Sequence, residues 1–139
     1  MRLLGLAVLA LAASPADASE NKPRKRQEPA KPCATWNGRV SGNDPNVAIK
    51  ATLCKAKDGR VHGTIVWSGR SGASTRAVSG TWSSQTLTLR DDRVDGTPNP
   101  GWKFCPIERY TLTRSGAHKL EGSYHSAECR DDATISLER

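Results

Sequence analysis

The sequence has few aromatic residues and few histidines, and it lacks the short motifs of common enzyme classes. Aromatic side chains make up 5% of the 139 residues, and only three histidines are present. The sequence contains no serine nucleophile elbow, no H-E-x-x-H pair and no phosphate-binding loop. Helical periodicity is hard to find, and eight prolines with twelve glycines argue against a long-helix or coiled-coil protein. What remains is a chain of one domain without a recognisable catalytic motif.

One long apolar run is present, at the N-terminus. Arg2 precedes the uncharged apolar residues 3–13, and Ala16-Asp17-Ala18 places small residues at the two positions that a signal peptidase tests. This run is too short to span a membrane as a stable helix. We therefore expect residues 1–18 to be a signal peptide, cleaved after Ala18, and the product to be exported to the periplasm or the cell exterior. A buried helix of the mature domain is the alternative.

Residues 19–32 form a basic segment with three prolines and no other apolar side chain larger than alanine. Such a composition cannot bury enough surface to fold, so we expect a disordered arm. The arm is either a solubilising linker or a weak electrostatic tether to an anionic surface such as lipid head groups, an anionic glycan or nucleic acid. The charges available for the tether are Lys22, Arg24, Lys25 and Arg26.

All four cysteines lie in the remaining segment, residues 33–139. In an exported chain an even number of cysteines predicts a disulfide framework, and the absence of a C-x-x-C pair disfavours zinc. A first turn at residues 42–45 places Cys33 opposite Cys54, and a hairpin turning near residues 115–117 places Cys105 nearly opposite Cys129. Of the three possible pairings, we predict the disulfides Cys33–Cys54 and Cys105–Cys129.

Apolar and polar residues alternate with a period of two along most of residues 33–139, and clusters of Gly, Asp, Asn, Ser and Pro separate the runs. Both features are typical of antiparallel strands. We predict an all-β domain of about eight antiparallel strands, a meander that closes as a small barrel or folds over as a sandwich. Turns are expected at Asn43-Asp44-Pro45, Asp58-Gly59, Ser71-Gly72 and Ser115-Gly116.

A glycine recurs on the apolar side of these strands in the pattern apolar-x-Gly-Ser/Thr-large, at residues 61–65, 78–82 and 120–124; Gly38 has a related setting after Trp36. Glycine weakens a strand, so its recurrence indicates either sharp coiling or room for a neighbouring Trp or Tyr. The pattern resembles lipocalin- and avidin-like barrels, in which Gly-x-Trp elements open or close strands. This resemblance implies a calycin- or avidin-like barrel shape, and no binding residue is transferred from it.

The longest irregular stretch covers residues 91–104. Residues 91–96 hold three aspartates before a glycine, which we interpret as a charged turn because the spacing differs from that of a calcium loop. Trp102 and Phe104 follow two residues apart and should share one side of the chain. They either plug one end of the barrel or, with Arg93, Lys103 and Arg109, form a contact surface for a sugar, an aromatic ligand or a protein partner.

A catalytic alternative rests on His125 and the carboxylates that follow it, Glu128, Asp131 and Asp132. A hydrolase needs a base within hydrogen-bond reach of a nucleophile or a water molecule, and this set could supply one. A histidine on a strand of a secreted domain is more often a surface group.

The sequence therefore favours a binding or interaction module that uses loop 91–104 and the barrel mouth. Its expected ligand is an anionic envelope polymer, a small molecule or another exported protein, which it could inhibit. The alternative is a small exported hydrolase or toxin that uses His125. We expect no cofactor and no metal. Nucleic acid is disfavoured, because residues 33–139 carry only 15 Lys+Arg against 11 Asp+Glu.

Overall fold

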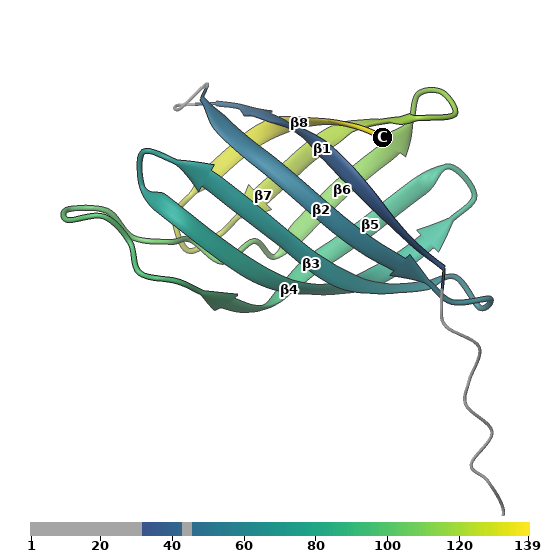
Figure 1. The fold of residues 1–139 in the computed structure, drawn as a ribbon, viewed down its shortest axis with the longest axis horizontal. Helices are drawn as coiled ribbons and strands as arrows, with labels where there is room; N and C mark the ends of the chain where they lie inside the picture. The colour runs from purple at the N-terminus through teal and green to yellow at the C-terminus, as the bar shows by residue number, and fades with distance from the viewer. Residues whose placement is uncertain (1–31, 43–45) are drawn as a thin grey trace, which may run out of the picture.

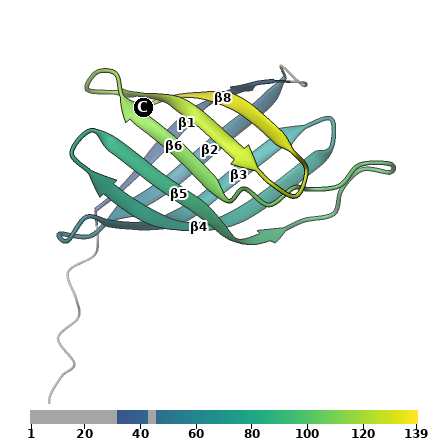
Figure 2. The same ribbon diagram turned by 180° about the vertical axis from the view of Figure 1, so that it is seen from behind.

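The computed structural model describes residues 32–42 and 46–139, which form eight antiparallel strands in one closed barrel (Figures 1 and 2). Each strand pairs with the next along the chain, and β8 pairs with β1 to close the sheet. This confirms the predicted all-β meander and selects the barrel over the sandwich. The strands are β1 (Cys33–Ser41), β2 (Val47–Lys55), β3 (Arg60–Gly69), β4 (Gly72–Ser83), β5 (Thr86–Asp95), β6 (Arg109–Arg114), β7 (Lys119–Ser126) and β8 (Asp131–Glu138).

The core lies inside the barrel and is built from alternate residues of every strand, as the period-two pattern predicts. Trp36, Tyr110 and five leucines are among its fully buried large side chains. Trp67 and Trp82 are only partly buried and pack against the two ends of this core. The described residues contain no helix with the length and hydropathy needed to cross a membrane.

Four strand glycines each face a leucine of a neighbouring strand at very close range. A Cβ atom built on any of them would overlap the backbone carbonyl next to that leucine, so close approach of the neighbouring strand, and not space for an aromatic ring, requires glycine at these positions. Together the four contacts involve all eight strands. The pairs are Gly38–Leu137, Gly63–Leu53, Gly80–Leu89 and Gly122–Leu112.

Replacing Gly80 by alanine is therefore expected to lower the free energy of unfolding by about 2–3 kcal/mol, because the new Cβ would meet the carbonyl oxygen of Thr88 and force β4 and β5 apart. Urea unfolding followed by circular dichroism measures the loss. Thr81→Ala, at the exposed neighbouring position, is the matched control and should change stability far less. Equal stability of the two variants would contradict the close approach.

Two disulfides join Cys33 to Cys54 and Cys105 to Cys129, the pairing that the hairpin spacing predicts. Cys33 and Cys54 are direct partners in the β1–β2 ladder. If the β6–β7 ladder were extended in its register, Cys105 would lie opposite Cys129. However, β6 begins after Cys105 and β7 ends before Cys129. Cys105 therefore lies in the β5–β6 connection and Cys129 in the β7–β8 turn, so the second disulfide joins two loops and not two strands.

The charged run at residues 91–96 is not the turn that the sequence suggested, because β5 continues to Asp95. A β-bulge shifts the β4–β5 register, so that Asp91 pairs with Val78 whereas Arg93 pairs with Ala77. Asp92 is thus the extra residue, and Asp91, which precedes the bulge, faces the barrel interior in phase with Leu87 and Leu89. The irregular connection covers residues 96–108 instead of 91–104.

Candidate functional site

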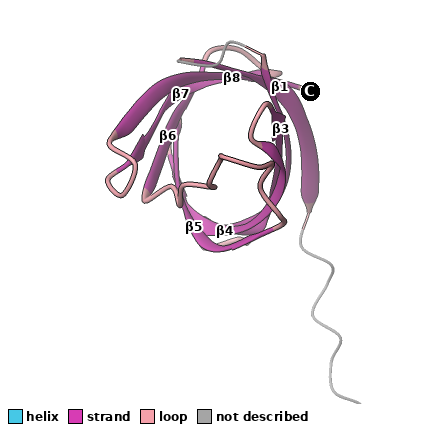
Figure 3. Ribbon diagram, turned by 90° about the vertical axis from the view of Figure 1, so that its left-hand side faces the viewer, coloured by secondary structure: helices cyan, strands magenta, loops and turns pink. Residues whose placement is uncertain are grey.

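A cavity of about 430 Å³ opens at the end of the barrel where the β5–β6 connection lies. The connection crosses this end of the ring of strands (Figure 3). Four aromatic side chains line the cavity: Trp67 from β3, Tyr124 from β7, and Trp102 and Phe104 from the connection. Its charged lining consists of Arg76, Lys103, Arg130 and Asp131.

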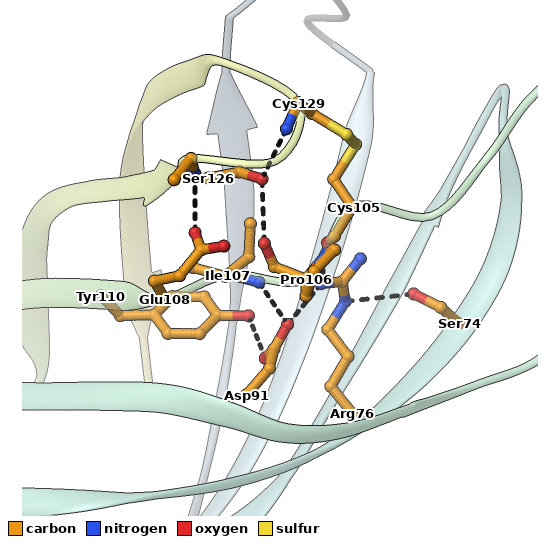
Figure 4. A network of polar contacts seen from close by, with 11 residues as sticks. Ser74, Arg76, Asp91, Cys105, Pro106, Ile107, Glu108, Tyr110, Ser126 and Cys129 are labelled. Carbon is orange, nitrogen blue, oxygen red and sulfur yellow. Dashed lines mark hydrogen bonds and ion pairs between the residues drawn. A yellow bond between two sulfur atoms is a disulfide. The ribbon is translucent and has the colours of Figure 1, made fainter.

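Arg76 and Asp91 form a buried ion pair beside this cavity, with side chains that are 4% and 1% exposed and an N–O distance of 2.5 Å. Their network appears in Figure 4. The Asp91 carboxylate also accepts hydrogen bonds from the Tyr110 hydroxyl and the Ile107 amide, each 2.8 Å long. Three donors thus bond to one carboxylate, and together they compensate for the loss of hydration that the buried negative charge of Asp91 suffers.

The Arg76 guanidinium is held on several sides. It donates to the carbonyl oxygen of Cys105 (2.7 Å) and to the Ser74 hydroxyl (3.2 Å). Its carbon atom lies 4.7 Å from the ring centre of Trp67. Arg76 on β4 therefore contacts β5, the aromatic wall and the β5–β6 connection at Cys105. These contacts fix the relative positions of the three.

Trp67 forms the centre of the aromatic wall. Its ring lies 5.2 Å from Tyr124 in an edge-to-face arrangement and 6.3 Å from Tyr110. Its indole N–H is the one buried side-chain donor or acceptor that lacks a hydrogen-bond partner among the described residues. The Tyr124 hydroxyl donates to Asp131 over 2.6 Å, so this acid of the lining is already engaged.

Burial is the main cause that raises the pKa of both tyrosines, and the adjacent carboxylates, Asp91 beside Tyr110 and Asp131 beside Tyr124, raise it further. Because folding favours the neutral phenols, their contribution to stability is complete below the unfolded pKa of about 10 and is lost as pH rises above it.

The sequence holds two tyrosines, so the absorbance of tyrosinate reports only on this network. We expect the native protein to show almost no tyrosinate until alkali unfolds it, whereas protein in concentrated urea should titrate at about pH 10, as free tyrosine does. Stability measured by urea unfolding should fall in the same alkaline range. A native-state titration that coincides with the denatured one would contradict the buried network.

The β5–β6 connection is anchored at two points, one near its C-terminal end and one at its tip. At its C-terminal end, the Cys105–Cys129 disulfide is supported by a hydrogen bond from the Ser126 hydroxyl to the carbonyl oxygen of Pro106 (2.9 Å). At its tip, the Asn99 amide and side chain donate to the carbonyl oxygens of residues 71 and 70 on the β3–β4 turn. The connection is thus held across the barrel end while Trp102 stays 53% exposed.

Three of the five predicted contact residues, Trp102, Lys103 and Phe104, line the cavity. The other two do not. Arg93 is exposed and paired with Asp95, and Arg109 borders a separate hollow on the outer surface. The basic arm residues Lys22, Arg24, Lys25 and Arg26 lie outside the described residues.

Of the hydrolase candidates, the structure brings His125 together with Asp132 but not with Asp131. His125 is on the outer face, where its Nδ1 lies 2.6 Å from Asp132 in an exposed pair. Asp131 points to the interior and bonds to Tyr124, and Glu128 is exposed in the β7–β8 turn. Neighbouring strand residues alternate between faces, so His125 and Asp131 cannot share one site here. Within residues 32–42 and 46–139, no group of three or more metal-ligating side chains could hold an ion.

Sequence reasoning missed Arg76, Trp67 as a wall residue, Tyr124 and Arg130. A signal for Arg76 was present, since it alternates in phase with the inward Val78. Comparisons with protein-family models, curated proteins and solved structures give no match to this chain. The chemistry of the cavity must therefore indicate what it binds.

Proposed function

We propose that this protein is an exported binding protein that holds a small amphipathic molecule, with a planar apolar body and one anionic group, in the cavity at the barrel end. The observation that supports this most directly is the combination of a cavity of about 430 Å³ with an aromatic wall and exposed cations. Ligand pockets of small proteins typically have this size and a few polar groups that orient the ligand.

The aromatic wall favours a planar apolar body. Trp67 and Tyr124 already pack edge to face, and Phe104 and Trp102 add ring surface from the connection. Aromatic rings provide large contact areas with little loss of conformational entropy on binding. The exposed Trp102 would lose solvent contact when a ligand enters.

The charges favour an anionic group. Arg76 is neutralised by Asp91, and Asp131 accepts from Tyr124, so neither is available as a simple countercharge. Lys103 and Arg130 are exposed, line the cavity and take part in none of the ion pairs found among the described residues. A carboxylate or sulfonate at the mouth would therefore meet two available cations.

The proposal includes export. Two disulfides are consistent with an oxidising compartment. The N-terminal sequence supplies the pattern of a cleaved signal, which supports the periplasm or the cell exterior as the destination. The Cys105–Cys129 disulfide would also hold the connection in its binding conformation, which reduces the entropy cost of binding.

Naphthoate is a suitable probe because it has a planar apolar body and one carboxylate. We expect Trp102→Ala to weaken naphthoate binding about tenfold, since it removes a large contact surface at the mouth. Heteronuclear NMR of the indole N–H groups measures affinity through Trp67, which remains as a reporter in the wall.

Arg93→Gln is the matched control for charge, because Arg93 is exposed but does not line the cavity. It should leave naphthoate affinity unchanged, whereas Lys103→Gln should weaken it several-fold. A naphthyl ammonium ion should bind more weakly than naphthoate. If naphthoate moves none of the indole signals, or moves all four equally, the proposal is wrong.

Trp102 supports a second candidate, the docking of another exported protein on the same barrel end. A tryptophan that is 53% exposed on an anchored loop is typical of residues that dominate protein interfaces. A protein partner would depend on Trp102 but not on Tyr124 inside the cavity, so Trp102→Ala and Tyr124→Phe would separate the two candidates.

A further inference from the structure

The opposite end of the barrel, where β1 begins and β8 ends, carries three cations stacked on two tryptophans. The guanidinium carbon of Arg139 lies 4.8 Å from the ring centre of Trp36, and that of Arg114 lies 4.9 Å from the ring centre of Trp82. The ammonium nitrogen of Lys55 is 5.9 Å from the same Trp82 ring. The Trp82 ring is fixed by a hydrogen bond from its indole N–H to the carbonyl oxygen of Ser84.

These side chains surround a second cavity of about 220 Å³. Leu53 and Val61 contribute apolar surface, and no aspartate or glutamate lines it. None of the ion pairs formed within the described ranges engages Lys55, Arg114 or Arg139. This cavity therefore gathers three positive charges without a countercharge in its lining.

Stacking leaves the arginines ready to bind an anion. A guanidinium that lies over an indole ring keeps the N–H groups of its edge free, and these groups match the oxygen atoms of a phosphate or sulfate. The ring also restricts the rotation of the long side chain, so less entropy is lost when an anion binds. Lys55 adds a third positive charge, and its ammonium group can interact with an anion from many directions.

We propose that this cavity binds a multiply charged oxyanion, namely a phosphate or sulfate group. Three cations around one cavity favour such a group over a single carboxylate. Pro32 accepts a hydrogen bond from the Lys55 amide at the rim of this end.

The four tryptophans make the test specific, because Trp36 and Trp82 line this cavity whereas Trp67 and Trp102 line the other. The experiment is an NMR titration of the full mature chain with inorganic phosphate, and with sulfate, at constant ionic strength adjusted with chloride. We expect saturable shifts of the Trp36 and Trp82 indole signals and none at Trp67 and Trp102. Failure of the naphthoate experiment would leave this result unaffected, because different indoles report on it.

Variants add a second criterion. Arg139→Gln should weaken phosphate binding at least fivefold, and Arg139→Lys, which keeps the charge but loses the planar fork, should have an intermediate effect. Arg139 is exposed, so both variants should fold normally, and Arg114→Gln provides an independent removal of charge. Arg60→Gln is the control, because Arg60 is at the same end but paired with Asp58.

Three outcomes would overturn the proposal: shifts that chloride reproduces, shifts spread equally over all four indoles, or phosphate affinity that is unchanged in Arg139→Gln and Arg114→Gln. Vesicles of phosphatidylglycerol identify the source of the group. Signal changes with these vesicles alone, and not with inorganic phosphate, would overturn a site for a small oxyanion in favour of a membrane-contacting surface.

Discussion

The Asp91→Ala variant should lose about 3–5 kcal/mol of unfolding free energy, because it leaves the buried Arg76 guanidinium without its countercharge. The lost carboxylate also accepts hydrogen bonds from the Tyr110 hydroxyl and the Ile107 amide. These two donors would be buried without their acceptor, which adds to the cost. Urea unfolding with a two-state fit measures the change.

Asp92→Ala is the matched control, since this exposed neighbour points outward and bonds to the Ser79 hydroxyl. It should change stability by less than about 1 kcal/mol. A double-mutant cycle with Arg76→Ala tests the pair directly, because removing both charges should cost much less than the sum of the single losses. An Asp91→Ala variant as stable as Asp92→Ala would show that the carboxylate is not buried in the pair.

Removal of both disulfides is the second change with a large expected effect. Each cross-link closes a loop of 21 or 24 residues in sequence separation. The loop-closure model assigns about 3 kcal/mol to each, so replacing all four cysteines by serine should cost about 6 kcal/mol. Many small domains have only about 5–15 kcal/mol in total, so the reduced chain should be largely unfolded at body temperature.

Circular dichroism and urea unfolding, with and without reductant, measure this loss. The two single removals differ in a useful way. Replacing Cys105 and Cys129 frees the connection that carries Trp102, and it should therefore weaken naphthoate binding as well as stability. Replacing Cys33 and Cys54, at the other end, should reduce stability alone. Cooperative unfolding of the four-serine variant at the urea concentration of the parent protein would contradict the expectation.

Much of the fold follows from local patterns in the sequence. The alternation of apolar and polar residues identifies the strands, because each strand has one face in the core. Both disulfide pairs follow from the hairpin turns, because the two cysteines of each pair lie at nearly equal distances in sequence from the turn between them. Two of the turns carry no glycine, asparagine or proline pattern that would predict them. At Ser84 and Arg130 the chain adopts positive φ angles of 54° and 51°, which usually mark glycine or asparagine. A residue other than glycine or asparagine that adopts a positive φ angle cannot be identified from composition.

The cavity was harder to predict than the barrel. Trp102, Lys103 and Phe104 stand out because three large side chains follow one another in a long connection. Arg76 and Asp91 are 15 residues apart in sequence, and they meet because the β4–β5 ladder places Asp91 opposite Val78, the inward neighbour of Arg76. Asp91 alternates in phase with Leu87 and Leu89, so an inward carboxylate was visible, but its partner on β4 was not.

Closure of the barrel also limits how another chain can bind. Pairing of β8 with β1 gives every strand two hydrogen-bonded neighbours, but β5 pairs with β6 only from Thr86 to Leu89. The last residues of β5 therefore offer an incomplete sheet edge, and this is where Asp92, Arg93 and Asp95 lie. Charged residues on an edge discourage the addition of a foreign strand. The charges at this edge should therefore protect the protein against edge-to-edge aggregation.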